Sequence, residues 1–357
     1  MTVNVALIGV GYWGPNVARA LAEVEGARLH TLCDADPDRL ARLRRLYPET
    51  RFVSDIDAVL ADGDVDAVVI ATPVSTHHEL ARTALMAGKH VLVEKPLAAT
   101  SAQCEELIAL ASERKLTLMV GHVFLFNAAV RKVKEYIDTG ELGEILYIYA
   151  QRLNLGQVRR DVNALWNFGP HDISILCYWL DAQPERVIAR GYSYVQPAIE
   201  DVVFMTLDFP NNVGANVHIS WLDPLKVRRM TVVGTKKMVV YDDVSADARI
   251  TVYDKGVSRT VVAPSGNQQQ SLGSYETFGE FQLLLRAGDV VIPKVDFVEP
   301  LRLECEHFVE CITSGARPLT DGVDGLRVVR VLEAAQRSLA NAGAPEVITA
   351  RSERPAS

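Results

Sequence analysis

Two short segments of the chain carry side chains that could move a proton at neutral pH. In VLVEKPLA, Lys95 stands between Glu94 and Pro96 at the end of an apolar run, where a desolvated lysine can act on a reacting hydroxyl. In WNFGPHDISIL, His171 follows Asn167 by four residues, so the two would share a helix face. Histidine titrates near neutrality and could exchange the proton of an alcohol. The alternatives are a solvated lysine before a turn and a histidine bonded at a helix start.

Other features of these motifs bear on the same site. The residue before a proline favours an extended backbone, and the Lys95–Pro96 bond is a candidate for a cis peptide. His77 and His78 follow ATPVST and are expected over a cofactor or at a helix start. His122 follows the last strand of the first half and could line a cleft. His218 lies in a predicted strand and is expected to be structural.

A glycine motif, Gly9-x-Gly11-x-x-Gly14, lies between an apolar strand pattern and a helical pattern. In that context Gly9 permits a tight turn, Gly11 lets the backbone approach a pyrophosphate, and Gly14 lets helix and strand pack closely. The helix N-terminus then presents N–H groups and a positive dipole end to the phosphates. The motif therefore predicts a dinucleotide site. The alternative is a glycine turn without a ligand.

The acidic residue that follows this motif points to the type of dinucleotide. Asp34 ends the second strand, 20 residues after Gly14, where a carboxylate can bind both ribose hydroxyls. Because that carboxylate would repel a 2′-phosphate, NAD is favoured over NADP. Arg39 and Arg42 stand close enough in sequence to leave NADP open as the alternative.

The first part of the chain alternates strands and helices and must position these residues. Short apolar runs at 3–9, 28–34, 65–73, 90–96 and 116–122 are typical of buried parallel strands. Helical patterns lie between them, at 14–24 with Pro15 in its first turn and at 100–115 with a capping box from Thr100 to Gln103. This order predicts a doubly wound parallel sheet.

The pattern changes after residue 122. Helical patterns at 127–143 and 166–180 precede strands at 202–222, 230–243 and 249–263. Turn signals at Asn211-Asn212, Gly234 and Lys255-Gly256 predict an antiparallel meander. Amphipathic helices are expected at 299–314 and 322–342, and the tail 350–357 is expected to be disordered. We therefore expect a dinucleotide-binding domain at 1–122 and a second α/β domain at 123–350.

Composition excludes several classes of protein. The 357 residues are 48% hydrophobic and 23% charged, with a net charge of -8, which favours neither nucleic acid nor anionic lipid as a partner. No apolar run approaches a membrane span, and the strand pattern at the start leaves no room for a signal peptide. Five scattered cysteines form no C-x-x-C pair, so we expect no metal site and no disulfide framework. Buried thiols of this kind indicate the cytoplasm.

Several of these segments together resemble one known family. The glycine motif, Asp34, ATPVSTHHEL, GKHVLVEKPLA, GHVFLFNAAV and the helix near GPHDI are similar to the Gfo/Idh/MocA oxidoreductases, and the resemblance extends to SGARPLTDGVDGLRVVRVLEAAQRS. It implies a Rossmann domain followed by an α/β domain with a large, open-faced, mostly antiparallel sheet. It also implies a homodimer or homotetramer formed through that sheet.

The resemblance assigns roles to the residues singled out above. The family oxidises or reduces a secondary alcohol of a sugar, inositol or nucleotide sugar with a nicotinamide cofactor. The family's catalytic lysine and histidine fall on Lys95 and His171. Inositol-dehydrogenase-like members often carry Asp four residues before the histidine, where this chain has Asn167. Because an amide cannot exchange a proton, Lys95 and His171 must carry the reaction.

Asn167 and GHVFLFN resemble the branch that acts at C3 of UDP-GlcNAc derivatives, particularly the uronate 3-dehydrogenases. Inositol dehydrogenases, deoxysugar 3-ketoreductases and a non-catalytic NAD-dependent sensor are the alternatives. Within QRLNLGQVRRDVNALWN, the arginines 152, 159 and 160 could meet a phosphate or carboxylate, at least one of them being a surface charge instead. The expected substrate residues are Lys95, His122, Asn127, Arg152, Asn154, Asn163, Trp166, Asn167 and His171. The expected cofactor residues are Gly9, Gly11, Tyr12, Trp13, Gly14, Asp34, Thr72, Pro73, Thr76, His77, Glu94, Lys95 and Pro96.

Overall fold

A computed structural model describes residues 2–156, 158–257, 260–262, 269–271 and 285–349. The expected tail at 350–357 lies outside these residues. The chain forms two compact units that interleave along the sequence. The first contains Met1–Asn127, Ile173–Ile175 and Phe297–Ala334, and the second contains Ala128–Asp172, Leu176–Asp296 and Ala335–Ser357. The C-terminal part of the chain thus returns to the first unit, which the expected division at residue 122 did not include.

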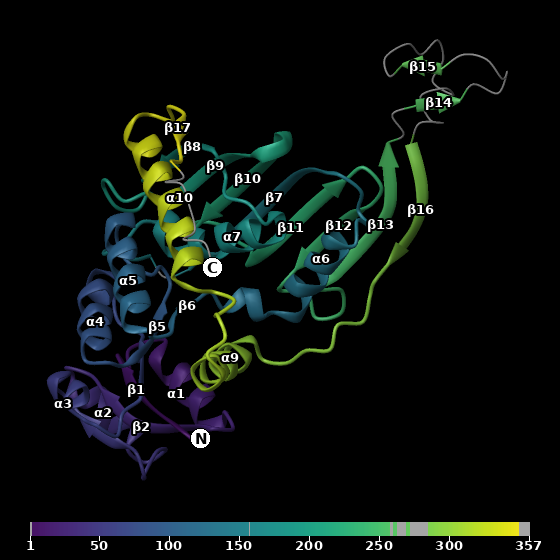
Figure 1. Cartoon of the computed structure of the whole chain (residues 1–357). Coiled ribbons are helices and arrows are strands. Elements are labelled where there is room, and N and C mark those ends of the chain that lie inside the picture. Colours follow the sequence, from purple (N-terminus) through teal and green to yellow (C-terminus); the bar gives the residue numbers. More distant parts are fainter. Residues whose placement is uncertain (1, 157, 258–259, 263–268, 272–284, 350–357) are drawn as a thin grey trace. The chain divides into compact units, whose positions relative to one another are not determined.

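The first unit contains the predicted parallel sheet. Its six strands have the order β3-β2-β1-β4-β5-β6 (Figure 1). Their bounds are β1 (Val3–Ile8), β2 (Ala27–Cys33), β3 (Arg51–Val53), β4 (Ala67–Ile70), β5 (His90–Glu94) and β6 (Leu118–Gly121). Every neighbouring pair is parallel. The strand order reverses between β1 and β4, and ligands of such sheets bind outside the carboxyl ends of the strands at this point.

Helices cover the two faces of this sheet. They are α1 (Gly14–Glu23), α2 (Pro37–Leu43), α3 (Asp57–Leu60), α4 (Val74–Met86) and α5 (Ser101–Arg114). Half of the predicted capping box is confirmed, since Thr100 Oγ1 accepts from Gln103 N at 3.3 Å, whereas Gln103 Oε1 accepts from Ala99 N at 3.2 Å and not from the N-cap N–H of Thr100. The later helix α9 (Pro300–Ser314) shares a buried core with α1, in which Cys305 and Phe308 join Val17 and Leu21.

The second unit contains a nine-stranded, mostly antiparallel sheet. Its order is β16-β13-β12-β11-β7-β10-β9-β8-β17. The bounds are β7 (Ile145–Leu153), β8 (Arg186–Tyr192), β9 (Val202–Phe209), β10 (Val213–Ser220), β11 (Val227–Gly234), β12 (Met238–Asp242), β13 (Ile250–Val257), β16 (Leu285–Val291) and β17 (Glu346–Val347). The mostly antiparallel sheet is confirmed, but it is not a simple meander. Strand β7 lies between β10 and β11 and pairs in parallel with β10.

Of the turns predicted in this sheet, the one at Asn211-Asn212 is confirmed and the one at Lys255-Gly256 is not. Asn211 and Asn212 form the turn between β9 and β10, both in the left-handed region at φ 61° and 59°. The turn predicted at Lys255-Gly256 is wrong, because β13 continues through it with a shift of register after Tyr253. A Cβ at Gly256 would lie 2.8 Å from Thr235 O. This glycine therefore permits a close approach of two backbone segments.

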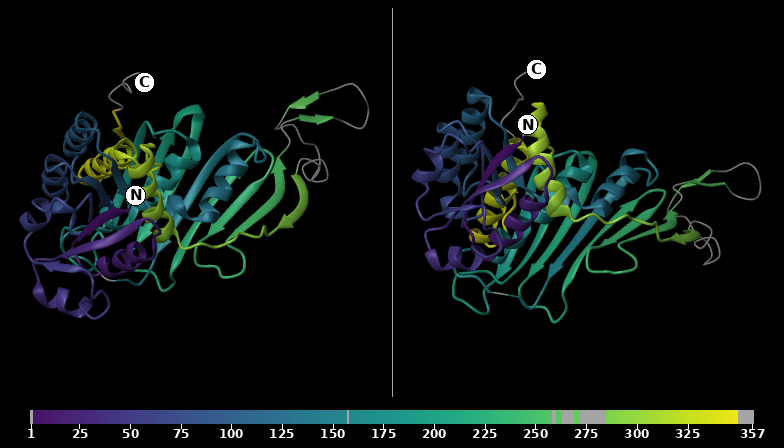
Figure 2. Two further views of the ribbon diagram at one scale, coloured as in Figure 1. Left: turned by 60° about the horizontal axis from the view of Figure 1, so that its bottom comes forward. Right: turned by 90° about the horizontal axis from the view of Figure 1, so that it is seen from below.

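Helices α6 (Ala128–Asp138) and α7 (Ala164–Leu180) lie on one face of the large sheet (Figure 2). Trp179 of α7 packs edge-on against Tyr241 and donates to Val130 O at 2.9 Å. On the strands, buried residues alternate with exposed ones such as Tyr149 and Phe204. This alternation is typical of a sheet with one covered face and one open face.

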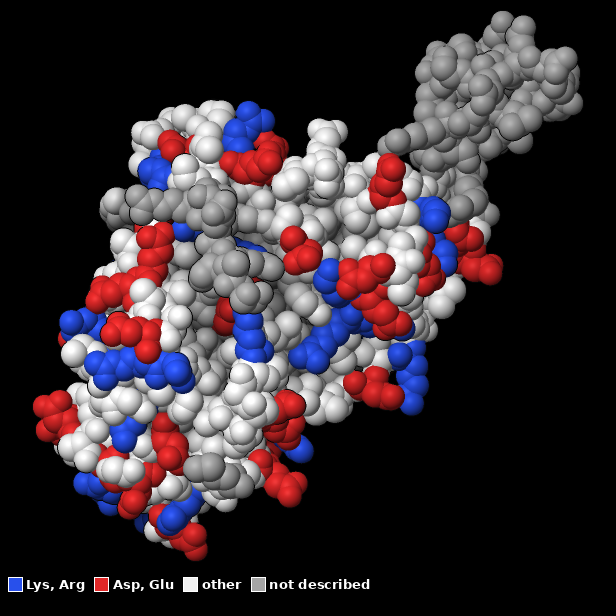
Figure 3. Space-filling model, in the orientation of Figure 1, with Lys and Arg blue, Asp and Glu red and all other residues white. Residues whose placement is uncertain are grey.

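The surface and the cysteines agree with the composition. Acidic and basic side chains are interspersed over the visible face of the described residues (Figure 3). All five cysteines are buried and none forms a disulfide. Within the described ranges, every helix falls short of the length and apolar character that crossing a bilayer requires.

Candidate active site

The glycine motif forms a cradle at the carboxyl end of β1. Gly9 has a φ of +93°, and a Cβ there would lie 2.7 Å from Ala71 O. A Cβ at Gly14 would overlap Gly9 O, so the start of α1 packs directly on the turn. At Gly11 the nearest atom to a Cβ is Arg39 Nη1, at 3.5 Å. Gly9 and Gly14 are therefore required by the fold, whereas Gly11 leaves space for a ligand.

The N-terminus of α1 is suited to a phosphate group. Its N-cap residue, Trp13, makes no side-chain capping hydrogen bond, and Pro15 follows in the first turn. Tyr12 beside it is 90% exposed. The first N–H groups of a helix and its positive dipole end favour an anion at this position. The residues present thus fit the pyrophosphate of a dinucleotide.

Asp34 lies at the end of β2 and is buried. Its Oδ2 accepts from Val10 N at 2.8 Å and its Oδ1 accepts from Asp36 N at 2.9 Å. Arg39 approaches Oδ2 to 3.6 Å. The carboxylate thus fixes the glycine turn as well as standing where a ribose is expected. Sequence reasoning found only the second of these roles.

Thr72 and Pro73 lie in the turn between β4 and α4, and Thr76 and His77 lie in the first turn of α4. Thr76 Oγ1 donates to Thr72 Oγ1 at 2.7 Å or to Pro73 O at 2.8 Å. The His77 ring is buried, with Nε2 2.9 Å from Thr72 O and Nδ1 2.8 Å from Pro96 O. Burial lowers the pKa of His77, and the two carbonyl contacts oppose this effect. The ring therefore connects the loop after β4 with the loop after β5.

Glu94-Lys95-Pro96 stands at the carboxyl end of β5, and the Lys95–Pro96 peptide is cis, as the sequence predicted. Glu94 Oε1 accepts from Trp13 Nε1 at 2.6 Å, which joins this loop to the glycine cradle. Burial raises the pKa of Glu94, with Lys95 opposing the effect. The acidic residue of this motif thus holds the loop in which Lys95 stands.

His122 and Asn127 lie just after β6, on either side of a short helix. His122 is 1% exposed, and neither ring nitrogen has a hydrogen-bond partner among the described residues. Burial lowers its pKa to about 3, with Lys95 contributing. Asn127 follows the short helix η1 (Val123–Phe126) and is buried. His122 is therefore a neutral, enclosed ring, which distinguishes it from the open cleft residue expected from sequence.

Sequence reasoning missed one buried acid in the first unit. Glu304 of α9 is 1% exposed, and its Oε1 has no partner within the described part of the chain. Burial, together with the Glu94 carboxylate, raises its pKa well above the usual range. The available signal was its position on the apolar stripe of α9, beside Leu301, Cys305 and Phe308.

In the second unit, α7 carries the predicted catalytic histidine. His171 and Asn167 lie four residues apart on this helix and are partly exposed, so the shared helix face is confirmed. Asn163 caps the helix by accepting from Trp166 N at 3.0 Å. Its Nδ2 donates to Glu200 Oε2 at 2.7 Å and to Gln336 Oε1 at 2.9 Å.

These contacts change the expectation for two substrate residues. The side-chain amide of Asn163 is engaged on both its oxygen and its nitrogen. Trp166 Nε1 donates to Gln336 Oε1 at 3.2 Å, while the ring stays partly exposed. Asn163 therefore serves the start of α7, in place of the sugar hydroxyl expected from sequence, whereas Trp166 keeps exposed surface.

Arg152 lies on β7 and is buried in an ion pair. Its Nε and Nη2 donate to the two oxygens of Asp172 at 2.8 and 2.9 Å, and both side chains are buried. Its guanidinium therefore anchors α7 beside His171, and its contact with a phosphate or carboxylate of the substrate stays a prediction. Arg159 pairs with Asp161, its neighbour in an exposed loop. Arg160 is also exposed, as one of the three arginines was expected to be, and Asn154 is partly buried next to Gly156.

Two family models match the chain. The model described as an oxidoreductase family with an NAD-binding Rossmann fold matches residues 3–122, and the Gfo/Idh/MocA C-terminal domain matches residues 130–240. Inositol 2-dehydrogenase 2 of Saccharopolyspora erythraea is 33% identical over 228 residues, which cover 61% of this chain and 67% of the relative.

Two further comparisons span more of the chain. UDP-N-acetylglucosamine 3-dehydrogenase of Acidithiobacillus ferrooxidans is 28% identical over 329 residues, or 92% of this chain and 94% of that protein. A solved structure of that enzyme superposes with a TM-score of 0.77 at 24% identity, covering 96% of this chain and 99% of the other. The fold, the glycine cradle and these matches agree: the chain is an NAD-binding oxidoreductase that belongs to the Gfo/Idh/MocA family.

Proposed function

We propose that this enzyme transfers a hydride between NAD(H) and a secondary alcohol or ketone of a sugar or nucleotide sugar, with C3 as the reacting carbon. The main support for the proposal is the contact between the glycine cradle and the loop Glu94-Lys95-Pro96. Trp13 of the glycine motif binds Glu94 at 2.6 Å, so Lys95 follows directly from a residue tied to the cofactor cradle. Both segments lie at the carboxyl edge of one parallel sheet.

In the proposed reaction, each residue of the site has a separate role. NAD, when bound, supplies the nicotinamide ring that accepts or returns the hydride. Lys95 orients and polarises the reacting oxygen, and its ammonium favours the negative charge that develops there. His171 takes the hydroxyl proton during oxidation and returns it during reduction. Asn167 and Asn127 position the substrate by hydrogen bonds, since an amide cannot exchange a proton.

The nucleotide-sugar substrate is supported by the relative from Acidithiobacillus ferrooxidans, whose name specifies UDP-N-acetylglucosamine and which aligns over 92% of this chain. Trp166 offers exposed ring surface for the apolar face of a sugar. We propose the UDP-GlcNAc-uronate 3-dehydrogenase type of activity. The deoxysugar 3-ketoreductases remain the alternative within this class.

A second candidate is an inositol dehydrogenase, because the relative from Saccharopolyspora erythraea has that activity in its name and is 33% identical. Asn167 argues against it, since the related inositol-dehydrogenase-like proteins often carry Asp there. A third candidate is a non-catalytic NAD-dependent sensor. The presence of both Lys95 and His171 argues against this role.

The test is the absorbance at 340 nm when the protein is mixed with NAD and a panel of UDP-sugars, dTDP-sugars and inositols. We expect NADH to form with a nucleotide sugar, and UDP alone to inhibit competitively. Thermal shift with the same panel, with NAD and with NADP, reports ligand binding without turnover. NADH formation with an inositol and no inhibition by UDP would favour the second candidate. Binding of sugars without any NADH would favour the sensor.

We also infer that the enzyme works in the cytoplasm as a homodimer or homotetramer. Five buried cysteines without a disulfide support a reducing compartment. The open face of the large sheet, with exposed aromatic residues such as Tyr149 and Phe204, supports self-association. Cell fractionation and sedimentation test the two statements separately.

A further inference from the structure

Lys95 stands between two backbone groups that are each held by a side chain. On its amino side, the Glu94 carboxylate accepts from the Lys95 N–H at 3.3 Å through Oε2. The other oxygen of the same carboxylate, Oε1, accepts from Trp13 Nε1 at 2.6 Å. The indole thus fixes the carboxylate that in turn caps the backbone of Lys95.

On the carboxyl side, His77 holds the next residue. Its Nδ1 lies 2.8 Å from Pro96 O, and its Nε2 lies 2.9 Å from Thr72 O. The ring is 1% exposed, so water cannot replace it as a partner of the two carbonyl oxygens. Turning the ring away would therefore cost free energy. His77 therefore restrains the backbone that follows Lys95.

Both restraints begin at the cofactor cradle. Trp13 is the N-cap residue of α1 and directly precedes Gly14. Thr72 ends the turn after β4, and its hydroxyl accepts from Thr76 at 2.7 Å. The two contacts therefore connect the glycine loop and the turn after β4 with the two sides of one lysine.

The packing behind the loop leaves Glu94 little room. A Cβ at Gly121 of β6 would lie 3.1 Å from Glu94 Oε2 and 3.2 Å from Glu94 Cα. The neighbouring strand therefore supports the carboxylate from behind, while the indole holds it from the cradle. A displacement of Trp13 would be transmitted to Glu94, because the carboxylate has no space in which to relax toward β6.

We propose that Trp13 and His77 are positioning residues, which couple occupancy of the NAD cradle to the orientation of the Lys95 ammonium. The glycine loop and the turn after β4 would hold NAD, and Trp13 and His77 join these segments to the backbone on either side of Lys95. The inference rests on the proposed role of Lys95. A lysine displaced by about 1 Å from its productive position loses on the order of 100-fold in rate.

The experiment uses the full-length protein with its lysines labelled as ¹³C-dimethyl derivatives by reductive methylation. The NMR signal of Lys95, assigned by its absence in Lys95→Arg, is followed with and without NAD and without any sugar. Trp13→Phe keeps an aromatic ring and removes the indole N–H donor. His77→Leu removes both ring nitrogens, and His77→Gln restores one amide donor.

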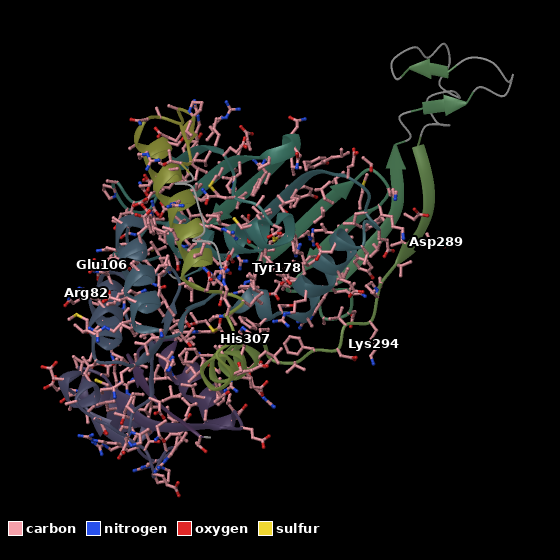
Figure 4. The ribbon with its side chains drawn as sticks, viewed as in Figure 1. Arg82, Glu106, Tyr178, Asp289, Lys294 and His307 are labelled. Atoms are coloured by element: carbon pink, nitrogen blue, oxygen red, sulfur yellow. The ribbon has the colours of Figure 1, made fainter. Side chains whose placement is uncertain are left out.

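His78→Gln is the matched control. His78 neighbours His77 on α4, but its ring binds Glu106 of α5 at 2.9 Å. Arg82 binds the other oxygen of the same carboxylate at 2.9 Å, and Figure 4 shows Arg82 and Glu106 side by side on the two helices.

In the wild type and in His78→Gln, we expect NAD to shift the Lys95 signal. In Trp13→Phe and His77→Leu, we expect less than half of that shift and a kcat about tenfold lower or more, with a smaller change in the sugar KM. His77→Gln should recover part of both. A full NAD-induced shift and full turnover in Trp13→Phe and His77→Leu would overturn the inference.

Three further outcomes are decisive. If His77→Leu fails to fold, Trp13→Phe decides alone, because Trp13 is 37% exposed and an aromatic ring is retained. If no sugar is oxidised but the Lys95 shift still depends on Trp13 and His77, the coupling holds and the proposed function fails. If Lys95→Arg abolishes turnover while the two variants behave as the wild type, the function holds and the coupling fails.

Discussion

The Asp34 carboxylate holds two backbone N–H groups with its two oxygens, and we propose that the same oxygens bind a ribose. It accepts from Val10 N and Asp36 N and stands where a ribose is expected. Asp34→Asn replaces one acceptor by a donor that faces an N–H group. We expect the Kd for NAD to rise about tenfold or more, the preference to move toward NADP, and the unfolding free energy to fall by about 1–3 kcal/mol.

Fluorescence titration with both cofactors and urea unfolding check this prediction. Asp38→Asn is the control, because Asp38 is exposed in the first turn of α2. An unchanged ratio of NAD to NADP affinity in Asp34→Asn would contradict the role given to this residue.

The buried pair Arg152–Asp172 provides a second test at the scale of single residues. Removing one partner leaves the other charge buried without compensation, so Arg152→Met or Asp172→Leu should each lower the unfolding free energy by about 3–5 kcal/mol. The double variant should lose less than the sum of the two. Urea unfolding of the three variants gives the coupling energy. Additive losses would show that the pair does not act as a unit.

His122 links stability to pH. Burial lowers its pKa to about 3, whereas an unfolded histidine titrates near 6.5. Between these values the unfolded chain binds a proton that the folded chain excludes, so acidification destabilises the fold. The contribution is about 1.4 kcal/mol per pH unit below pH 6.5.

We therefore expect His122→Leu to flatten the loss of stability between pH 6.5 and pH 5, relative to the wild type. Urea unfolding at a series of pH values measures the two slopes. Equal slopes would mean that His122 is protonated in the folded protein.

At this scale the sequence suggested candidate residues more readily than it suggested their contacts. Asp34, Lys95 and His171 could be chosen because their types and their places at strand or helix ends specify a chemistry. The protein contacts of Arg152 and Asn163 could not be predicted, because the sequence of a motif does not identify the partner of a polar side chain. Their partners, Asp172 and Gln336, lie 20 and 173 residues away along the chain.

Among the elements, the turn from β1 to α1 makes the strictest demand on residue type. Gly9→Ala and Gly14→Ala each place a Cβ against backbone oxygen, of Ala71 and of Gly9 respectively. We expect both variants to lose NAD binding at least tenfold and to unfold at lower urea concentration. Gly63→Ala is the matched control, since a Cβ there meets nothing within 4 Å. Wild-type NAD affinity in Gly14→Ala would contradict the geometry of the cradle.

The elements of the first unit could be predicted because each strand is a short apolar run between helical patterns. The second unit was harder. The strand β7 was missed, since ILYIYAQRL follows a helix and no turn signal relates it to its partners β10 and β11. Gly256 was mistaken for a turn, because a glycine that permits close backbone approach has the same local pattern.

For the molecule as a whole, the open face of the large sheet predicts self-association. Tyr149 is 36% exposed and Phe204 43% exposed on this face. We expect sedimentation velocity to show a dimer or a larger species, and Tyr149→Asp with Phe204→Asp to dissociate it, because charges would be buried without partners. Leu46→Asp is the control, since Leu46 is 67% exposed on the first unit. A monomeric wild type would refute the expectation.

The central claim is that Lys95 and His171 together act on one alcohol. Turnover of Lys95→Ala and His171→Ala, measured as absorbance at 340 nm with NAD and the sugar that the wild type oxidises, tests it most directly. The account predicts that each variant folds and loses about 100-fold or more in turnover. Wild-type turnover in both variants, with intact folding, would contradict it.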